Sequence, residues 1–208
     1  TQEEVDEFLY PEYQKHIHDP FLFADMQKAV DRIFLAIKEG QKITIHGDYD
    51  ADGVSASTVL TDTLTALGAA NVGVYLPHRE TDGYGLNINT INYLAEQGTS
   101  LIITCDCGIS NPKEVAHANT LGVDTIITDH HTIPDQLPEA LALIHPKLPN
   151  ETYPCKTLSG GAVAFKLAQG LLAHHKKDHE TLTNGETHAG FEKWLLDMVA
   201  IANVADMV

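Results

Sequence analysis

The sequence is short of cysteine, of basic residues and of long apolar runs, and each shortage excludes a class of protein. Three cysteines among 208 residues, without the spacing of a disulfide framework, predict a reducing, cytoplasmic setting. No apolar run approaches the roughly 20 residues that a membrane-spanning helix needs, and we see no secretory signal. We therefore expect a cytoplasmic protein that does not cross a membrane.

Positive charge is also scarce, with 13 Lys and Arg residues against 29 Asp and Glu residues and a net charge of -16. This balance argues against a broad electrostatic grip on nucleic acid by this chain. Nucleic acid is not excluded, because divalent cations offset part of the charge and a basic domain elsewhere could supply the rest. The chain begins at Thr1 and ends abruptly at Val208, so we expect a fragment.

What the sequence does contain is an alternation of short apolar runs with amphipathic segments. An irregular, acidic and aromatic lead-in is expected over 1–23. Strands are predicted over 42–46, 72–76, 101–105, 125–128 and 140–144. Helices are predicted over 25–40, 87–97, 112–121, 159–172 and 191–205, and a further helix follows the aspartate-rich loop and runs through Val59, Leu60, Leu64 and Leu67 to Gly68. The alternation predicts an α/β fold: a mostly parallel five-stranded sheet with helices on both faces, an N-terminal helical lead-in and C-terminal helices.

The most informative stretch follows the first predicted strand and carries one imidazole and three carboxylates. These groups belong to His46, Asp48, Asp50 and Asp52. Carboxylates this close repel one another unless a cation lies among them. Hard oxygen ligands with one histidine suit magnesium or manganese better than a metal that prefers thiolates. For this stretch alone, an Asp/Gly-rich surface turn remains the alternative.

Two more predicted strands end in groups of the same kind. The strand over 101–105 leads to Asp106, and the strand over 125–128 leads to Asp129, His130 and His131. Ligands of open parallel sheets gather beyond the carboxyl ends of the strands, so we expect these groups to meet. Asp129 could then orient a histidine ring by accepting its spare N–H. Taken alone, Asp106 could instead belong to an ordinary turn.

Four weaker candidates lie elsewhere in the chain. Arg79 is either a phosphate clamp or an ordinary surface arginine. Ser159, Gly160 and Gly161, with Lys166 further along, form either an anion cradle or a tight helix entry. Asp206 alone would be part of a frayed C-terminus, and the histidine-rich run over 174–179 is more typical of a solvated loop than of a metal site.

Taken together, the motifs resemble the DHH phosphoesterase superfamily, named for the triplet Asp129-His130-His131. The form His46-Gly47-Asp48-Tyr49-Asp50-Ala51-Asp52-Gly53 resembles the RecJ family, whose members are exonucleases specific for single-stranded DNA. Further matching motifs are Gly83-Tyr84-Gly85-Leu86-Asn87, Asp106-Cys107-Gly108, Gly161-Ala162-Val163-Ala164-Phe165-Lys166 and Ala205-Asp206-Met207-Val208. The resemblance implies that residues 1–40 are a lead-in and helix packed on the domain, and that 41–208 are the DHH catalytic domain.

The resemblance also implies roles for individual residues. One cation would be held by His46, Asp50 and Asp106, and a second by Asp52, Asp106, His130 and Asp206. His131 would approach the scissile phosphate, and Asp48 would lie behind the ligands or beside the substrate. Arg79, Ser159, Gly160, Gly161 and Lys166 remain candidates for substrate binding. Two divalent cations are expected, with Mn²⁺ preferred and Mg²⁺ possible, because two histidines belong to the ligand set.

The implied activity is hydrolysis of single-stranded DNA from the 5′ end to mononucleotides, in DNA repair and recombination. The implied partners are single-stranded DNA, the missing C-terminal DHH-associated and oligonucleotide-binding domains, and a helicase or single-strand-binding protein. The nearer alternative is an oligoribonuclease or cyclic-dinucleotide phosphodiesterase of the same superfamily. The more distant one is a non-catalytic scaffold.

Overall fold

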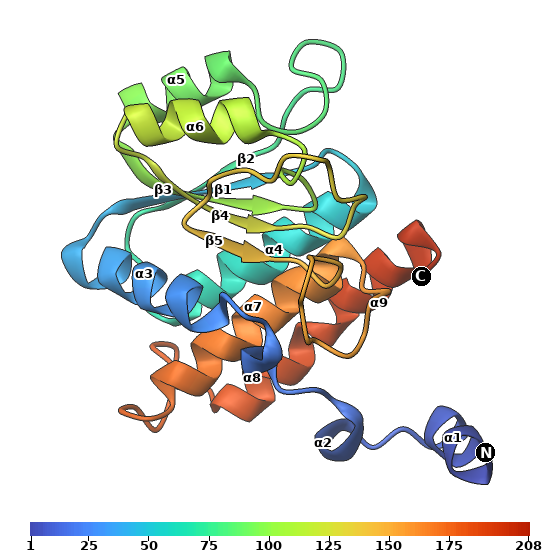
Figure 1. Ribbon diagram of the computed structural model, residues 1–208. Coiled ribbons are helices and arrows are strands. Elements are labelled where there is room, and N and C mark those ends of the chain that lie inside the picture. Colours follow the sequence, from blue (N-terminus) through green and yellow to red (C-terminus); the bar gives the residue numbers. More distant parts are fainter.

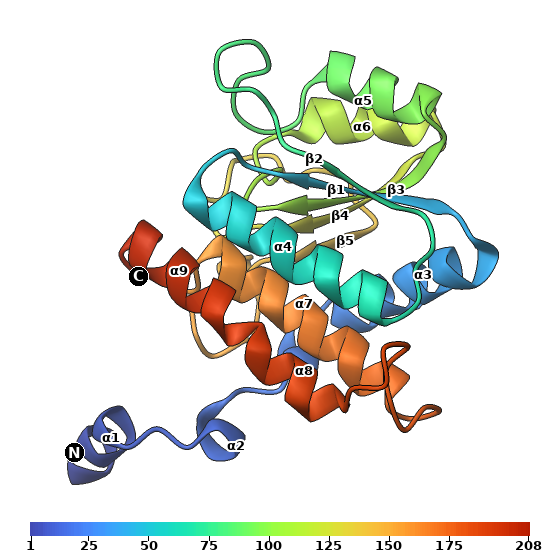
Figure 2. The ribbon, with the colours of Figure 1, turned by 180° about the vertical axis from the view of Figure 1, so that it is seen from behind.

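The computed structural model describes the backbone of residues 1–208 and all side chains except those of Glu3, Glu4, Glu7 and Gln14. Its lead-in contains three short helices, α1 (Gln2–Leu9), α2 (Tyr13–His16) and the 3₁₀ turn η1 (Pro20–Leu22). The lead-in is therefore more regular than the sequence predicted. Figures 1 and 2 show α1 extending away from the body of the molecule.

The body is built on one parallel sheet with the strand order β2-β1-β3-β4-β5. The strands are β1 (Lys42–Gly47), β2 (Val72–Tyr75), β3 (Thr99–Cys105), β4 (Asp124–Thr128) and β5 (Ala142–Ile144). Neighbouring strands pair in parallel throughout. The central strands β1, β3 and β4 are buried almost along their whole length, as expected for a sheet covered on both faces. This confirms the predicted α/β class.

Two layers of helices cover the sheet (Figure 1). On one face lie α5 (Ile88–Glu96) and α6 (Pro112–Thr120), and on the other lie α3 (Met26–Glu39), α4 (Ala51–Ala66), α7 (Gly160–His175) and α9 (Leu196–Asp206). Helix α7 is buried around almost its whole circumference, because it packs against both α4 and α9. This central helix is important for the site, because its N-terminus points at the aspartates.

The C-terminal region differs from the sequence prediction in one respect. In place of one helix over 191–205, the chain forms α8 (His188–Trp194) and α9, which meet at Leu195. Apolar residues run through the junction, so periodicity alone did not show the break. None of the described helices combines the length and apolarity that crossing a membrane requires.

Strand register explains why the polar groups meet at one edge of the sheet. Gly47 at the end of β1 pairs with Cys105 of β3, and Cys105 pairs with Thr128 of β4. The next residue in each strand continues this pattern: the amide of Asp48 donates to the Cys105 carbonyl at 3.1 Å, and the amide of Asp106 donates to the Thr128 carbonyl at 3.0 Å. The three loops therefore leave the sheet side by side.

Candidate metal centre

The side chain of Asp52 is fixed by the N-terminus of the central helix α7. It lies in the first turn of α4, is 1% exposed, and its two carboxylate oxygens accept hydrogen bonds from the amides of Gly160 at 2.7 Å and Gly161 at 2.6 Å. Ser159 caps the same helix through the amide of Ala162. Burial nevertheless raises the pKa of Asp52, and the two amide hydrogen bonds oppose that rise.

This arrangement corrects one expectation. The sequence suggested that Ser159, Gly160 and Gly161 bind an anion of the substrate. The anion at this helix N-terminus is instead the carboxylate of Asp52, which takes both glycine amides. The signal for an anion site was sound, but the bound anion comes from the protein itself, from a residue 108 positions earlier in the chain.

Asp106 lies at the centre of the cluster in an unusual conformation. Its φ is 62°, in the left-handed region that Asp and Asn adopt more readily than most residues, and its side chain is 1% exposed. Gly160 lies so close that a Cβ atom there would lie 2.5 Å from the Cβ of Asp106. Burial raises the pKa of Asp106 to about 7, and the neighbouring Asp52 carboxylate adds to the effect.

The imidazole of His130 is the point at which the acids converge. Its Nε2 atom lies 3.0 Å from Asp106 Oδ1, 3.6 Å from Asp206 Oδ2 and 3.7 Å from Asp52 Oδ2. Although burial opposes protonation, the contact with Asp106 raises the pKa of His130. Asp206, at the end of α9, is brought into the site although 154 residues separate it from Asp52. The three carboxylates expected to hold the second cation thus surround the Nε2 atom of the fourth expected ligand, His130.

His131 is held by Asp129 beside this cluster. Its Nδ1 atom lies 2.8 Å from Asp129 Oδ1, and this hydrogen bond raises the pKa of His131 to about 9. Burial of the Asp129 carboxyl is outweighed by hydrogen bonds from His131 and from the amide of Ile109, so the pKa of Asp129 is lowered. The His131 side chain is 42% exposed and within reach of a bound molecule. Asp129 therefore fixes the direction of the His131 ring through its Nδ1 atom.

A second acidic group forms around the loop after β1. Asp48, Asp50 and Asp106 each place a carboxylate oxygen within 4.8 Å of the others. Asp50 also caps α4, because its Oδ1 atom accepts from the Gly53 amide at 2.9 Å. Burial raises the pKa of Asp48. Asp106 belongs to this group and also to the group with His130 and His131.

His46 lies apart from these groups. Among the described side chains, His46 belongs to none of the groups of acids and histidines that lie close enough to share an ion. The group in which it was expected, with Asp50 and Asp106, contains Asp48 instead. Its ring is fully buried, 5.4 Å from the ring of Tyr75, and burial lowers its pKa to about 4. His46 is therefore a neutral imidazole, and its role as a ligand stays a prediction.

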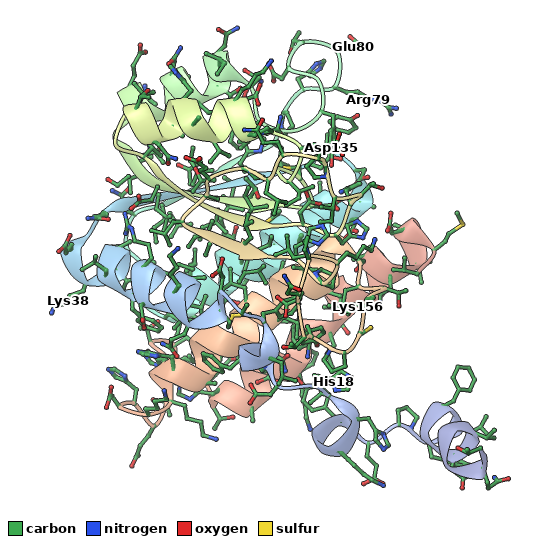
Figure 3. All side chains as sticks on the ribbon, in the orientation of Figure 1. His18, Lys38, Arg79, Glu80, Asp135 and Lys156 are labelled. Carbon is green, nitrogen blue, oxygen red and sulfur yellow. The ribbon has the colours of Figure 1, made fainter. Side chains whose placement is uncertain are left out.

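The two basic candidates lie outside the cluster. Arg79 is exposed on the loop between β2 and α5 (Figure 3), where its guanidinium stacks 5.2 Å from the centre of the Tyr49 ring. Lys166 is 5% exposed and its ammonium donates to the carbonyl of His18 at 2.9 Å and to Gln169 Oε1 at 2.8 Å. Contrary to the expectation, Lys166 thus joins α7 to the lead-in and is not directed at a substrate.

Tyr84 is a site residue that was missed as an individual candidate. Its hydroxyl lies 3.1 Å from His131 Nδ1 and donates to the Asp106 carbonyl at 3.3 Å. The flanking Gly83 and Gly85 both have φ of 76°, a left-handed conformation that glycine adopts without strain. The alternation of glycine with one aromatic residue in this loop was the available signal.

The chemistry of the cluster fits divalent cations. Four buried polar atoms have no well-directed hydrogen bond among the described residues: His46 Nε2, Asp48 Oδ1, Asp106 Oδ1 and His130 Nε2, although the last two lie 3.0 Å apart. Buried polar atoms normally have one, so such a set needs another partner. Carboxylate oxygens together with imidazole nitrogens are ligands that suit Mn²⁺, whereas other metals prefer thiolates. The buried thiols of Cys105 and Cys107 have raised pKa values because of burial, and they stay protonated.

Fold and site together define a parallel α/β domain with a candidate cation centre at the carboxyl edge of its sheet. Residues 42–202 match the family model described as "DHH family, N-terminal domain". The chain belongs to the DHH family.

The chain is also similar to several RecJ exonucleases. It is 42% identical over 208 residues to the single-stranded-DNA-specific exonuclease RecJ of Bacillus subtilis, covering all of this chain and 24% of that protein. A solved structure of exonuclease RecJ bound to manganese superposes with a TM-score of 0.76 at 31% identity, over 91% of this chain and 45% of that one. RecJ of Thermus thermophilus in complex with Mn²⁺ gives a TM-score of 0.69 at 30% identity, over 90% and 26%. The chain thus spans about a quarter of the Bacillus relative.

Proposed function

We propose that this chain is the catalytic part of a metal-dependent exonuclease that hydrolyses single-stranded DNA from the 5′ end. The observation that carries the proposal is the convergence of Asp52, Asp106 and Asp206 on His130 Nε2 within 3.7 Å. Similarity to RecJ exonucleases over the whole chain supports the substrate class. Two structural relatives bind manganese, which supports a divalent cation at this edge.

The ligand groups favour two cations, with Mn²⁺ preferred over Mg²⁺. Asp52, Asp206, His130 and Asp106 would hold one, and Asp50 with Asp106 and either Asp48 or His46 would hold the other. When bound, such cations polarise the phosphate and lower the pKa of the attacking water. Contacts in the fold support two of these ligands: the N-terminus of α7 holds the Asp52 carboxylate, and the amide of Asp106 is bonded at the end of β3.

The remaining groups would act on the substrate or hold the groups that do. The hydrogen bond that His131 Nδ1 donates to Asp129 keeps His131 protonated, so its ring would donate to a phosphate oxygen or give a proton to the leaving 3′-oxygen. Arg79, whose guanidinium lies over the ring of Tyr49 between Asp48 and Asp50 in the sequence, would contact a phosphate. The hydroxyl of Tyr84 would help to hold the ring of His131, because it lies 3.1 Å from the same Nδ1 atom.

The net charge of -16 indicates that most of the grip on DNA comes from parts of the protein beyond these residues. We propose that residues 41–208 are the catalytic domain, with 1–40 packed on it, and that an associated domain and an oligonucleotide-binding domain complete the cleft. The three free cysteines support a cytoplasmic setting. A helicase or single-strand-binding protein is the proposed partner that supplies unpaired strands.

The test is digestion of 5′- and 3′-labelled single strands by the intact protein with Mn²⁺. Release of mononucleotides from the 5′ end is expected, and Asp52→Asn should lower the rate at least about 100-fold. Asp62→Asn, an exposed carboxylate on the same helix α4, is the matched control and should leave the rate unchanged. Hydrolysis of dinucleotides without attack on long strands would favour the oligoribonuclease or cyclic-dinucleotide phosphodiesterase. Failure to bind Mn²⁺ at all would favour a scaffold.

A further inference from the structure

The backbone of the two neighbouring histidines has no support from the sheet. β4 ends at Thr128, and the segment after it runs as a loop. The backbone amides of both histidines donate to Asp129 Oδ1, that of His130 at 2.7 Å and that of His131 at 3.1 Å. The carbonyls must be held by other groups if the two rings are to keep fixed directions.

Those groups come from the segment that follows the neighbouring strand β5. The side chain of His145 lies with its Nε2 atom 3.1 Å from the carbonyl of His131, and the ammonium of Lys147 lies 2.5 Å from the carbonyl of His130. Thr128 pairs with Ile144, so the register of β4 and β5 brings the two loops together. Pro146 restricts the residue before it to extended backbone, which fixes the direction of His145.

The hydrogen bonds of His145 define its tautomer. The amide of Lys147 can only donate, and it lies 3.1 Å from Nδ1, while the carbonyl of His131 can only accept from Nε2. His145 is therefore a neutral imidazole with its proton on Nε2. It is fully buried and takes no place in the acidic groups of the metal centre. A buried polar side chain that uses both nitrogens on backbone atoms is a structural clamp.

We propose that His145 and Lys147 are positioning residues that fix the backbone carbonyls of His131 and His130 and thereby aim both rings at the metal centre. The inference rests on the proposed function. A ligand must be held within about 0.5 Å of its productive position, and partners behind a ligand typically change metal affinity by about 10–100-fold. His130 Nε2 lies 3.0 Å from Asp106, so rotation of this peptide would separate the two ligands.

The test measures Mn²⁺ affinity of the intact protein by titration calorimetry, with kcat and KM on single-stranded DNA as second readouts. His145→Ala is expected to weaken Mn²⁺ binding about 10–100-fold. His145→Gln should recover much of the loss, because its amide N–H reaches the same carbonyl as Nε2. Lys147→Met should weaken binding in the same direction, with kcat falling and KM for DNA unchanged.

Lys156→Met is the matched control, because Lys156 stands in the same connection between β5 and α7 and also donates to a backbone carbonyl, that of Glu151 at 2.9 Å (Figure 3). It should bind Mn²⁺ like the wild type. If His145→Ala does not fold, the exposed Lys147 carries the test. Wild-type affinity in both folded variants would overturn the positioning role. A wild-type protein that binds no Mn²⁺ would instead overturn the proposed function.

Discussion

Replacing Asp106 by Asn should stabilise the metal-free protein while removing its metal site. The carboxyl of Asp106 has a pKa of about 7 in the fold against an ordinary value of 3.8, because it is buried beside Asp52. A shift of this size corresponds to about 4 kcal/mol of free energy that the ionised form costs the folded state. Asn suits the site because it tolerates the φ of 62° at this position, whereas Ala would be strained there.

The pH dependence has a definite sign. A carboxyl with a raised pKa stabilises the fold below pH 3.8, and that contribution is lost as the pH rises through about 7. In chelator, the free energy of unfolding of Asp106→Asn should therefore match that of the wild type near pH 4 and exceed it by up to about 4 kcal/mol at pH 8. For a domain of this size, that is a rise in Tm of roughly 8–16 °C.

The assay is thermal or urea unfolding at several pH values in EDTA and in Mn²⁺. Mn²⁺ should raise the wild-type stability by about 2.7 kcal/mol per site at 100 times its Kd, and should raise that of the variant much less. Asp62→Asn, on the exposed side of α4, is the control and should stay within about 0.5 kcal/mol of the wild type. If Asp106→Asn is destabilised at pH 8 in EDTA, burial beside Asp52 does not disfavour the ionised Asp106 carboxylate as described.

Three further outcomes are expected. Gly160→Ala should remove Mn²⁺ binding in calorimetry, because its Cβ would lie 2.5 Å from that of Asp106, whereas Gly73→Ala, with its nearest neighbour at 4.0 Å, should bind normally. Burial lowers the pKa of Lys166 to about 8, so the free energy of unfolding should rise by about 3 kcal/mol between pH 8 and 10.5 as measured with urea. Lys166→Met should not show this rise. The Nδ1 atom of His175 lies 2.9 Å from Nε2 of His188, and burial lowers the pKa of both imidazoles. The free energy of unfolding should therefore fall as the pH drops below 6.5. In thermal unfolding, His188→Gln should show a smaller fall, and an unchanged fall would exclude this pair as its cause.

The sheet and the meeting of its strand ends could be predicted from the sequence because both follow from local patterns. Apolar runs such as 101–105 alternate with helices, and parallel strands put their carboxyl ends at one edge. That rule alone was enough to predict that Asp106 and Asp129 lie near one another. Asp206 was placed by resemblance alone, since an acid at the end of an apolar helix carries no signal of its own.

What the sequence could not show are the contacts between distant segments. The partner of Asp52 is a helix N-terminus more than 100 residues away, so the glycines at its start were assigned to a substrate anion. Lys166 looked like part of the same cradle, but it lies about one and a half turns further along α7 and points at the lead-in. The clamp formed by His145 depends on strand register, which a single sequence does not reveal.

The central claim is that acids and imidazoles at one sheet edge hold divalent cations. The most direct measurement is an anomalous difference map from crystals of this protein grown with MnCl₂. The account predicts two peaks, one among His130 Nε2, Asp52 and Asp206 and one beside Asp50, with Asp106 touching both. A map with no peak at this edge, or with manganese bound only elsewhere, would contradict it.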